Sequence, residues 1–402
     1  MKLSKRFAAL GLSLVMVLAL AACGNDSADA TPTPAQGTEQ GGDTTPAPDD
    51  GGDTADEGLR IAIVTSPNTV DDGSFNEDNY NGILNFIASR GDIDTVTALQ
   101  EQTGDSAAVA QMVSDIIADY DVLVTTGFQS AAIGPVAQDN PDKYFILVDT
   151  FPTDAEGVTI EGGLDNVYAM QFAEQEGGFF AGVAAAMETQ SGKVAVVTGQ
   201  PFPSNVNYQY GFESGVNYAN THLGASAEIV ELASYAGVDT TGTNVGGNYT
   251  GNFVDEAAGK TLGEALIREG VDIMFVAAGG SGNGVFAAAK ESGTCMVIGC
   301  DVDQYDDGAN GDSNIILTSA LKNMAINVER QLNAIVDGTF EGGNYTLDAS
   351  TDSTGYVSAE GRQQLSQETL DALAELYPQV KDGTIVPASG SNGYTPEEFP
   401  GL

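Results

Sequence analysis

The sequence is poor in the side chains that most often carry catalysis and metal binding. Its 402 residues include no tryptophan, three cysteines and one histidine, His222. A zinc site draws its ligands from clusters of Cys and His, and an enzyme nucleophile needs a base beside it. His222 lies in a predicted helix end, away from the loops that follow the predicted strands. We therefore expect no metal site, no cofactor and no enzymatic activity.

Positive charge is also scarce. Fourteen Lys and Arg residues face 57 Asp and Glu residues, which gives a formal net charge of −43. A field of this sign repels nucleic acids and anionic lipid surfaces. The charge balance excludes nucleic acid as a partner, and an anionic ligand would need local compensation.

Two of the three cysteines lie in one apolar run, Cys295-Met-Val-Ile-Gly-Cys300. A strand would separate them by roughly 16 Å and place them on opposite faces of a sheet. A disulfide requires a much shorter Cα separation. We expect two buried thiols that are not bonded to each other.

The third cysteine follows a cationic stretch and an almost unbroken apolar segment, residues 7–20. This segment is too short for a comfortable membrane span, and the pattern predicts a signal peptide over residues 1–22. The run Leu20-Ala-Ala-Cys23 resembles a bacterial lipobox, in which Cys23 is acylated and anchors the protein on the extracytoplasmic face of the cell membrane. Ordinary secretion with an incidental cysteine is the alternative.

Residues 24–58 consist mainly of Gly, Thr, Pro, Ala, Asp and Gln, with no Leu, Ile, Val, Phe or Tyr. The segment carries carboxylates and no cation, so it repels itself and cannot bury a core. Together with Cys23 it predicts a lipidated, acidic tether over residues 23–58.

The remaining body, residues 59–402, alternates short β-rich runs with helical stretches. Such alternation predicts an α/β fold with parallel sheets covered by helices on both faces. The predicted strands are 60–65, 94–98, 122–126, 144–149, 193–198, 227–232, 272–277, 296–301 and 314–319. The predicted helices are 79–89, 107–119, 173–189, 205–220, 254–268, 284–292 and 322–336. Ligands of such sheets bind beyond the carboxyl ends of the strands.

Four of the loops at those ends hold candidate ligand residues. Phe75 follows the first strand, either as a staple onto the core or as a stacking platform. The Gly-rich turn at residues 279–284 offers backbone N–H groups, Gly280 among them, to a ligand oxygen. Asp301 suits two adjacent sugar hydroxyls, whereas Asp303 is more typical of a cap or an ion pair. Lys322 lies at a strand–helix junction, with a solvated surface lysine as the alternative.

Five ordered motifs carry a family resemblance. They are Asp71-Asp-Gly-Ser-Phe-Asn76, Glu176-Gly-Gly-Phe-Phe-Ala-Gly-Val183, Ala278-Gly-Gly-Ser-Gly-Asn-Gly284, Gly299-Cys-Asp-Val-Asp-Gln304 and Thr318-Ser-Ala-Leu-Lys-Asn323. The chain resembles the basic membrane protein (BMP) family, lipoproteins that bind purine nucleosides for ABC importers. The resemblance implies the type I periplasmic-binding-protein fold, with two Rossmann-like lobes joined by a three-stranded hinge. The expected lobes are 59–166 plus 322–345 and 167–321 plus 346–402.

The resemblance also implies roles for individual residues. Phe75 is expected to stack on the base, with Asp72 and Asn76 beside it. Asp301 and Lys322 are expected to hold the ribose. Candidates for the second aromatic are Phe202 and Phe275.

One position departs from the family pattern. The family usually has an Asp nine residues before the stacking Phe, and here that position is Ser66. A carboxylate only accepts hydrogen bonds when ionised, whereas a hydroxyl donates or accepts. We therefore expect Ser66 to turn its proton to either kind of base edge and to discriminate among bases less sharply.

The function implied is capture of a nucleoside, with a purine favoured, between the lobes of a monomer and delivery to an ABC importer permease. The first alternative is a lipoprotein that senses a ligand for a membrane receptor, and a second is binding of another ribose-like molecule. A hydrolase using Asp71 and Asp72 stays open, although adjacent loop aspartates normally point apart and serve as caps.

The lipobox generates a prediction. Cys23→Ser removes the acylation site and leaves the apolar segment, so the variant should leave the membrane fraction. Cys295→Ser, which keeps the lipobox, should stay with the membranes. Sedimentation after a high-salt wash measures both, and a Cys23→Ser protein that still sediments would show that the protein is not lipid-anchored.

Overall fold

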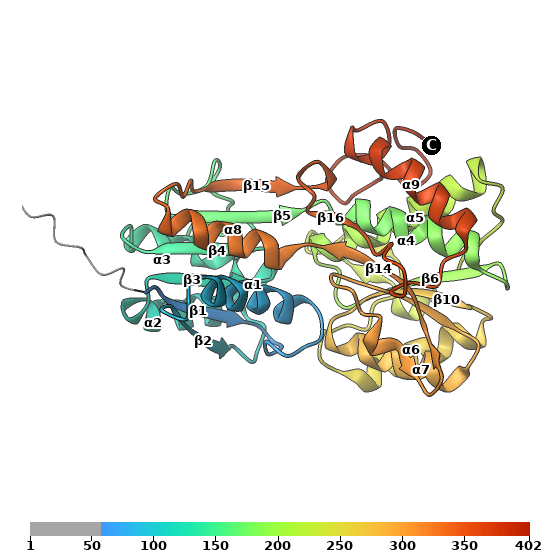
Figure 1. Ribbon diagram of the computed structural model, residues 1–402, viewed down its shortest axis with the longest axis horizontal. Helices are drawn as coiled ribbons and strands as arrows, with labels where there is room; N and C mark the ends of the chain where they lie inside the picture. Colours follow the sequence, from blue (N-terminus) through green and yellow to red (C-terminus); the bar gives the residue numbers. More distant parts are fainter. Residues whose placement is uncertain (1–57) are drawn as a thin grey trace, which may run out of the picture. The chain divides into compact units, whose positions relative to one another are not determined.

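The computed structural model describes residues 58–402 (Figure 1). The predicted signal peptide, Cys23 and all but the last residue of the predicted tether lie outside the described residues. Within residues 58–402 no helix has the length and apolar character needed to cross a membrane.

One six-stranded sheet is parallel throughout, in the order β15-β5-β4-β3-β1-β2. Its strands are β1 (Arg60–Thr65), β2 (Thr95–Gln100), β3 (Val122–Thr126), β4 (Tyr144–Val148), β5 (Val167–Phe172) and β15 (Gly343–Leu347). Helices α1 (Phe75–Ser89) and α8 (Met324–Val336), far apart in sequence, pack side by side on one face. Helices α2 (Ser106–Ile116) and α3 (Gly134–Asp139) cover the other. Strand residues alternate between the two cores, as the two-residue period requires.

The second sheet has the order β16-β14-β11-β10-β6-β7 and is parallel except for β16. Its strands are β6 (Lys193–Thr198), β7 (Glu228–Ile229), β10 (Ile273–Ala277), β11 (Met296–Gly299), β14 (Ile316–Lys322) and β16 (Thr354–Tyr356). Helices α4 (Glu174–Glu188), α5 (Pro203–His222) and α9 (Gln367–Lys381) pack on one face. Helices α6 (Glu256–Arg268) and α7 (Gly280–Ser292) pack on the other.

Short elements complete the described chain. Two hairpins pair β8 (Gly237–Val238) with β9 (Asn244–Gly246) and β12 (Ala309–Asn310) with β13 (Ser313–Asn314). Short 3₁₀ helices are η1 (Ile117–Asp119), η2 (Phe128–Ile133), η3 (Ala233–Tyr235), η4 (Asp306–Gly308) and η5 (Ala349–Thr351).

The α/β expectation is confirmed, and β1, β3 and β6 have the predicted bounds. The strand expected at 227–232 shortens to β7. Beyond it, the side chain of Asn248 bonds Val230 O and Leu232 N in place of a neighbouring strand. The expected lobe boundary at residue 167 also differs, because β5 pairs with β4 and β15 in the first sheet. The chain leaves that sheet only after Phe172.

The two cysteines of the body are buried and free. Cys300 packs in the core under α4 and α5, and Cys295 in the core under α6 and α7. The predicted placement on opposite faces is confirmed.

Between the two sheets the described chain crosses three times, at Ala173, at Asn323 and at residues 348–353. The crossings are hydrogen-bonded to one another or to the strands beside them. Ala173 N donates to Leu347 O at 2.8 Å, and Asn323 N donates to Ser353 O at 2.9 Å. Glu176 accepts from Ala349 N at 2.8 Å and from the hydroxyl of Thr354. These bonds couple the three crossings mechanically.

Helices α4 and α5 approach closely because glycines line their contact. A Cβ added at Gly182 would lie 2.0 Å from Phe212 O, and one at Gly215 would lie 2.1 Å from Phe179 O. Gly178 and Gly211 lie four residues before Gly182 and Gly215. A Cβ added at either would lie 2.5 Å and 2.2 Å, respectively, from a backbone atom of the other helix. Residues four apart share one helix face, so the crossing leaves no room for side chains there.

This crossing generates a stability prediction. Gly182→Ala should destabilise the protein by roughly 1–3 kcal/mol or more, because backbone rather than a flexible side chain must move. The matched control is Gly177→Ala on the same helix, where the nearest atom to an added Cβ is 3.5 Å away. That change should stabilise by up to about 1 kcal/mol through reduced backbone entropy. Chemical denaturation measures both, and equal effects would contradict the packing account.

Candidate functional site

A cavity lies at the carboxyl ends of β1, β3, β4, β10, β11 and β14, where the two sheets face each other. It holds about 630 Å³ of space free of protein atoms, open solvent at its mouth included. Strand ends are where open α/β sheets bind ligands.

Most of the residues predicted from the sequence line this cavity. They are Ser66, Asp72, Phe75, Asn76, Phe202, Asp301 and Lys322. Two others do not line it. Phe275 is fully buried in the sheet core, with its ring 5.5 Å from that of Tyr208 and 5.9 Å from that of Phe212. Gly280 begins α7 behind the cavity, and its neighbour Gly279 forms the wall instead.

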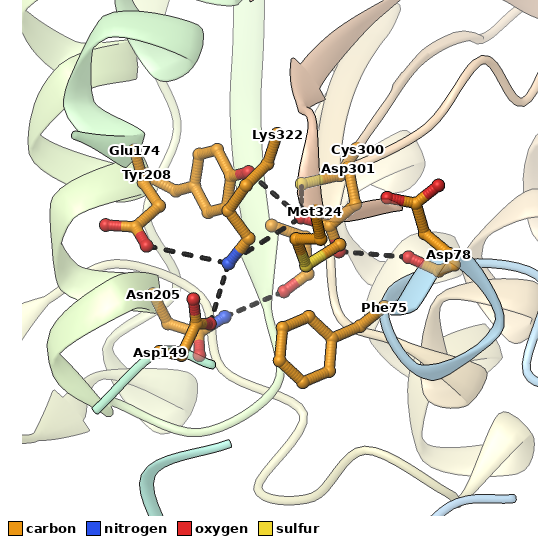
Figure 2. Close-up of polar contacts among 12 residues, drawn as sticks. Phe75, Asp78, Asp149, Glu174, Asn205, Tyr208, Cys300, Asp301, Lys322 and Met324 are labelled. Carbon is orange, nitrogen blue, oxygen red and sulfur yellow. Dashed lines mark hydrogen bonds and ion pairs between the residues drawn. The ribbon is translucent and has the colours of Figure 1, made fainter. Parts of the chain in front are cut away.

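Lys322 occupies the centre of the site (Figure 2) and is 2 % exposed, so a solvated surface lysine is ruled out. Its Nζ lies 2.6 Å from Asp149 Oδ2, 3.5 Å from Glu174 Oε1 and 4.0 Å from Asp301 Oδ1. Burial disfavours the ammonium, but these three carboxylates outweigh it and raise the lysine pKa. Lys322 is therefore charged throughout the physiological range.

The carboxylates around Lys322 outnumber it three to one. Burial raises the pKa of Glu174 to about 7, with the ammonium acting in the opposite direction. Burial also raises the pKa of Asp149, again opposed by Lys322. Asp149 and Asp301 both have left-handed backbones, with φ of 68° and 69°. Such conformations are uncommon outside glycine and are often found at functional sites.

Asp301 is held from both sides of the cavity. Its Oδ1 accepts from Tyr208 OH at 2.9 Å, and its Oδ2 accepts from Ser74 Oγ at 3.0 Å. Tyr208 lies on α5, which packs on the second sheet, whereas Ser74 directly precedes α1, which packs on the first. Burial raises the pKa of Tyr208, which keeps its phenol a donor. Asp303, by contrast, forms an ion pair with Arg362 at 2.6 Å, as expected from the sequence.

Asp72 caps the start of α1. It accepts from the backbone N–H groups of Ser74, Asn76 and Glu77 at 3.1 Å. The Asn76 amide also donates to it at 2.9 Å. Asp71 instead accepts from the hydroxyl of Thr69. The two carboxylates serve separate local structures, which argues against a hydrolytic pair.

Aromatic rings form one wall. Phe128, from the first sheet's side, stacks on Phe202 with ring centroids 5.2 Å apart. Phe202 in turn lies 5.9 Å from Phe253. The ring of Phe75 lies apart from these three, with its centroid 4.9 Å from Lys322 Nζ. The cavity thus has flat apolar surfaces beside a charged centre.

Ser66 is not free to turn its proton. Its Oγ donates to Glu101 Oε2 at 2.8 Å, and the same carboxylate accepts from Thr103 and from Gly104 N. Burial alone would raise the pKa of Glu101, but these donors lower it to about 2. Glu101 is therefore ionised and can only accept. The expected freedom of Ser66 is wrong, because Glu101 fixes its proton.

Several lining residues were not predicted from the sequence. They are Asn68, Phe128, Gln129, Asp149, Ser204, Asn205, Tyr208 and Phe253. Asp149, Phe128 and Gln129 follow strand ends, so the rule that found Asp301 also covers them. Tyr208 and Phe253 come from a helix and a long loop, where no sequence pattern marks the side that faces the cavity.

Comparisons with known proteins agree on the family. The model of the family Bmp, described as "ABC transporter substrate-binding protein PnrA-like", matches residues 60–232 and 235–388. The "CD4+ T-cell-stimulating antigen" of Listeria innocua is 28% identical over 400 residues, covering 95% of this chain and 98% of that protein. The "ABC transporter nucleoside-binding protein BmpA" of Lactococcus lactis is 27% identical over 348 residues, covering 81% and 88%.

Solved structures agree on the fold. A solute-binding protein of an ABC transporter system from Aeropyrum pernix K1 superposes with a TM-score of 0.68 at 23% identity, covering 83% of this chain and 94% of that one. One from Conexibacter woesei gives 0.59 at 19% identity, covering 82% and 99%. The expected type I periplasmic-binding-protein fold is confirmed.

The buried lysine generates a prediction. Lys322→Met leaves three buried carboxylates without a cation and should lower the free energy of unfolding by about 3–5 kcal/mol at pH 7. The folded-state pKa values of Asp149 and Glu174 are already raised, so these groups destabilise the fold as pH rises. Loss of the ammonium should raise these two pKa values further. The difference in free energy of unfolding between the variant and the original protein should therefore shrink as pH falls from 7 to 5, where the carboxyl groups become protonated.

The control is Lys381→Met, which removes an exposed pair with Asp352 and should change stability little. Denaturant titrations at several pH values test both variants. Equal losses in the two, or a Lys322→Met deficit that grows on acidification, would contradict the account.

Proposed function

The chain belongs to the family of PnrA-like ABC transporter substrate-binding proteins, and from that premise we propose that it captures a nucleoside between its two sheets for an ABC importer. Members of this family bind substrates for transporters and are not enzymes. The ligand of one similar protein is stated in its name, nucleoside-binding BmpA.

The observation that carries the proposal is the convergence of two surfaces in one cavity. The ring of Phe75 supplies a flat apolar face for a base, and base–aromatic stacking tolerates any base. Asp301 and Lys322 lie beside it with a carboxylate and an ammonium suited to sugar hydroxyls. Charge-assisted bonds of this kind are the stronger ones. A molecule with both a base and a sugar uses both surfaces.

Charge favours a nucleoside over a nucleotide. Asp149, Glu174 and Asp301 surround a single ammonium, and the whole chain carries a formal charge of −43. A phosphate placed among these groups would meet repulsion that one lysine cannot offset. A neutral sugar has no such cost.

Anchoring completes the proposal. Cys23 would carry lipid, and the acidic segment to residue 58 would let the body reach a permease in the same membrane. The protein would act as a monomer on the extracytoplasmic face, with a purine nucleoside as cargo.

Calorimetric titration tests the binding step. A purine nucleoside should bind more tightly than either its free base or ribose, because only the nucleoside occupies both surfaces. Phe75→Ala should weaken nucleoside binding by about 1–3 kcal/mol. If neither the nucleoside nor its parts bind, the proposed function is wrong.

Phe86 provides the matched control on the same helix, since it is fully buried in the core away from the cavity. Phe86→Ala should cost roughly 3–5 kcal/mol of stability, and Phe75→Ala less. Unchanged affinity together with a collapsed melting temperature in Phe75→Ala would identify Phe75 as a core staple instead.

A further inference from the structure

We propose that Asn207 of α5 is a positioning residue of the ligand site and that the C-terminal segment, residues 385–402, holds it in that role. Asn207 does not itself line the cavity. Through it the segment keeps the carboxylate of Glu174 against the ammonium of Lys322 (Figure 2). The inference rests on the proposed nucleoside function for its effect on the ligand.

The C-terminal segment lies against α5 (Figure 1). Its Phe399 is buried in the core of the second sheet, with the ring 6.3 Å from that of Phe179. Three hydrogen bonds join the segment to side chains of α5: Gly390 N to Asn207 Oδ1 at 3.0 Å, Ala388 N to Ser214 Oγ at 3.2 Å, and Asn217 Nδ2 to Pro396 O at 2.9 Å. The segment is therefore a fixed partner of the helix.

Gly390 determines which way the Asn207 amide faces. A backbone N–H can only donate, so the atom that accepts from it must be the amide oxygen. The Nδ2 atom then faces Glu174, and it donates one of its hydrogens to Oε2 at 2.9 Å. A flipped amide would set two donors against each other at Gly390, and hydrogen bonds left unmade are costly. Asn207 is thus a donor to Glu174 whether Glu174 is charged or neutral.

A donor fixed in this way favours the charged form of Glu174. A protonated Glu174 could donate to an amide oxygen, but here that oxygen is turned towards the C-terminal segment. Bonds made to the charged form of an acid favour that form. Burial raises the pKa of Glu174 to about 7, and Lys322 and Asn207 act in the opposite direction. The titratable groups facing Glu174 are Lys322 of β14, Asp149 at the end of β4 and Tyr208 of α5.

Glu174 differs in position from the other two carboxylates around Lys322. Asp149 and Asp301 line the cavity, whereas Glu174 lies behind it and is 2% exposed. A ligand that bonds the two lining carboxylates competes with Lys322 for them, but it does not reach Glu174. An ionised Glu174 therefore leaves the ammonium with a counter-ion when a ligand binds. With Glu174 protonated, the ammonium would depend on the groups that the ligand also needs, and affinity should fall.

Calorimetric titration of adenosine and guanosine into the full chain between pH 6 and pH 8 tests the inference. Affinity should rise with pH as Glu174 ionises. Asn207→Ala removes the donor, so affinity at pH 7 should fall severalfold and the midpoint of the pH profile should move upward by about one unit. Asn207→Asp keeps the size of the side chain and the acceptor for Gly390, but places a second carboxylate beside Glu174. It should shift the midpoint at least as far, which a role in packing alone would not do.

Asn217→Ala is the matched control, because it removes a different bond between α5 and the C-terminal segment. Its pH profile should match that of the original protein. A folded Asn207→Ala protein with the original profile would overturn the inference. Binding of neither nucleoside by the original protein at any pH would instead refute the proposed function.

The free energy of unfolding tests Asn207 without a ligand. A folded-state pKa raised further in Asn207→Ala makes Glu174 more destabilising as pH rises. The stability of this variant relative to the original protein should therefore fall between pH 6 and pH 8, whereas that of Asn217→Ala should stay constant. A constant difference in both variants would contradict the role of Asn207.

Amide hydrogen exchange tests the part played by the C-terminal segment. Gly390 is exposed, so its N–H should be protected only through its bond to Asn207. Exchange should be slow in the original protein and in Asn207→Asp, and fast in Asn207→Ala. The N–H of Val386, which donates to Pro400 O at 2.9 Å, should stay protected in all three and so report an intact segment. An unprotected Gly390 N–H in the original protein would show that the segment does not orient Asn207.

Discussion

The buried ammonium of Lys322 is the constraint on which the site depends. Lys322 lies at the end of β14, where the chain leaves the second sheet. Its Nζ is within 4.0 Å of carboxylate oxygens of Asp149 from the first sheet, Glu174 from the first crossing and Asp301 from the second sheet. A buried charge is tolerated only when it is paired and hydrogen-bonded. The geometry of the crossings and that of the ligand cavity are therefore fixed by one set of interactions.

The cavity has two ends with different chemistry. Around Lys322 the groups are charged, and the excess of carboxylates favours neutral hydroxyls over a phosphate. Around Ser66 the groups are neutral: the serine hydroxyl donates to Glu101, and the amides of Asn68 and Gln129 each donate one hydrogen to a backbone oxygen. Phe75 and the stack of Phe128 on Phe202 add apolar aromatic faces to the cavity.

Strand positions, and the residues directly after them, could be predicted from the sequence because apolar runs and the carboxyl-end rule are local. Asp301 and Lys322 follow from this rule, whereas Ser66 is reached only through the family resemblance. Phe275 was misplaced because β10 is buried on both faces, so apolar residues there do not reveal which way each side chain points. The hydrogen-bond partners that orient Ser66 and Gln129 are distant in the sequence. Glu101 is 35 residues from Ser66, and Ser66 O is 63 residues from Gln129, so no local pattern indicates these pairs. Gly178 and Gly182 of the Glu176–Val183 motif are required by the close approach of the α5 backbone, a long-range contact that no local pattern indicates.

A crystal structure of the protein with a bound purine nucleoside would test the central claim most directly. The account predicts sugar hydroxyls within hydrogen-bond distance of Asp301 and Lys322, and the base against the ring of Phe75. A nucleoside bound outside this cavity, or bound with its sugar at Ser66 and its base at Lys322, would contradict it.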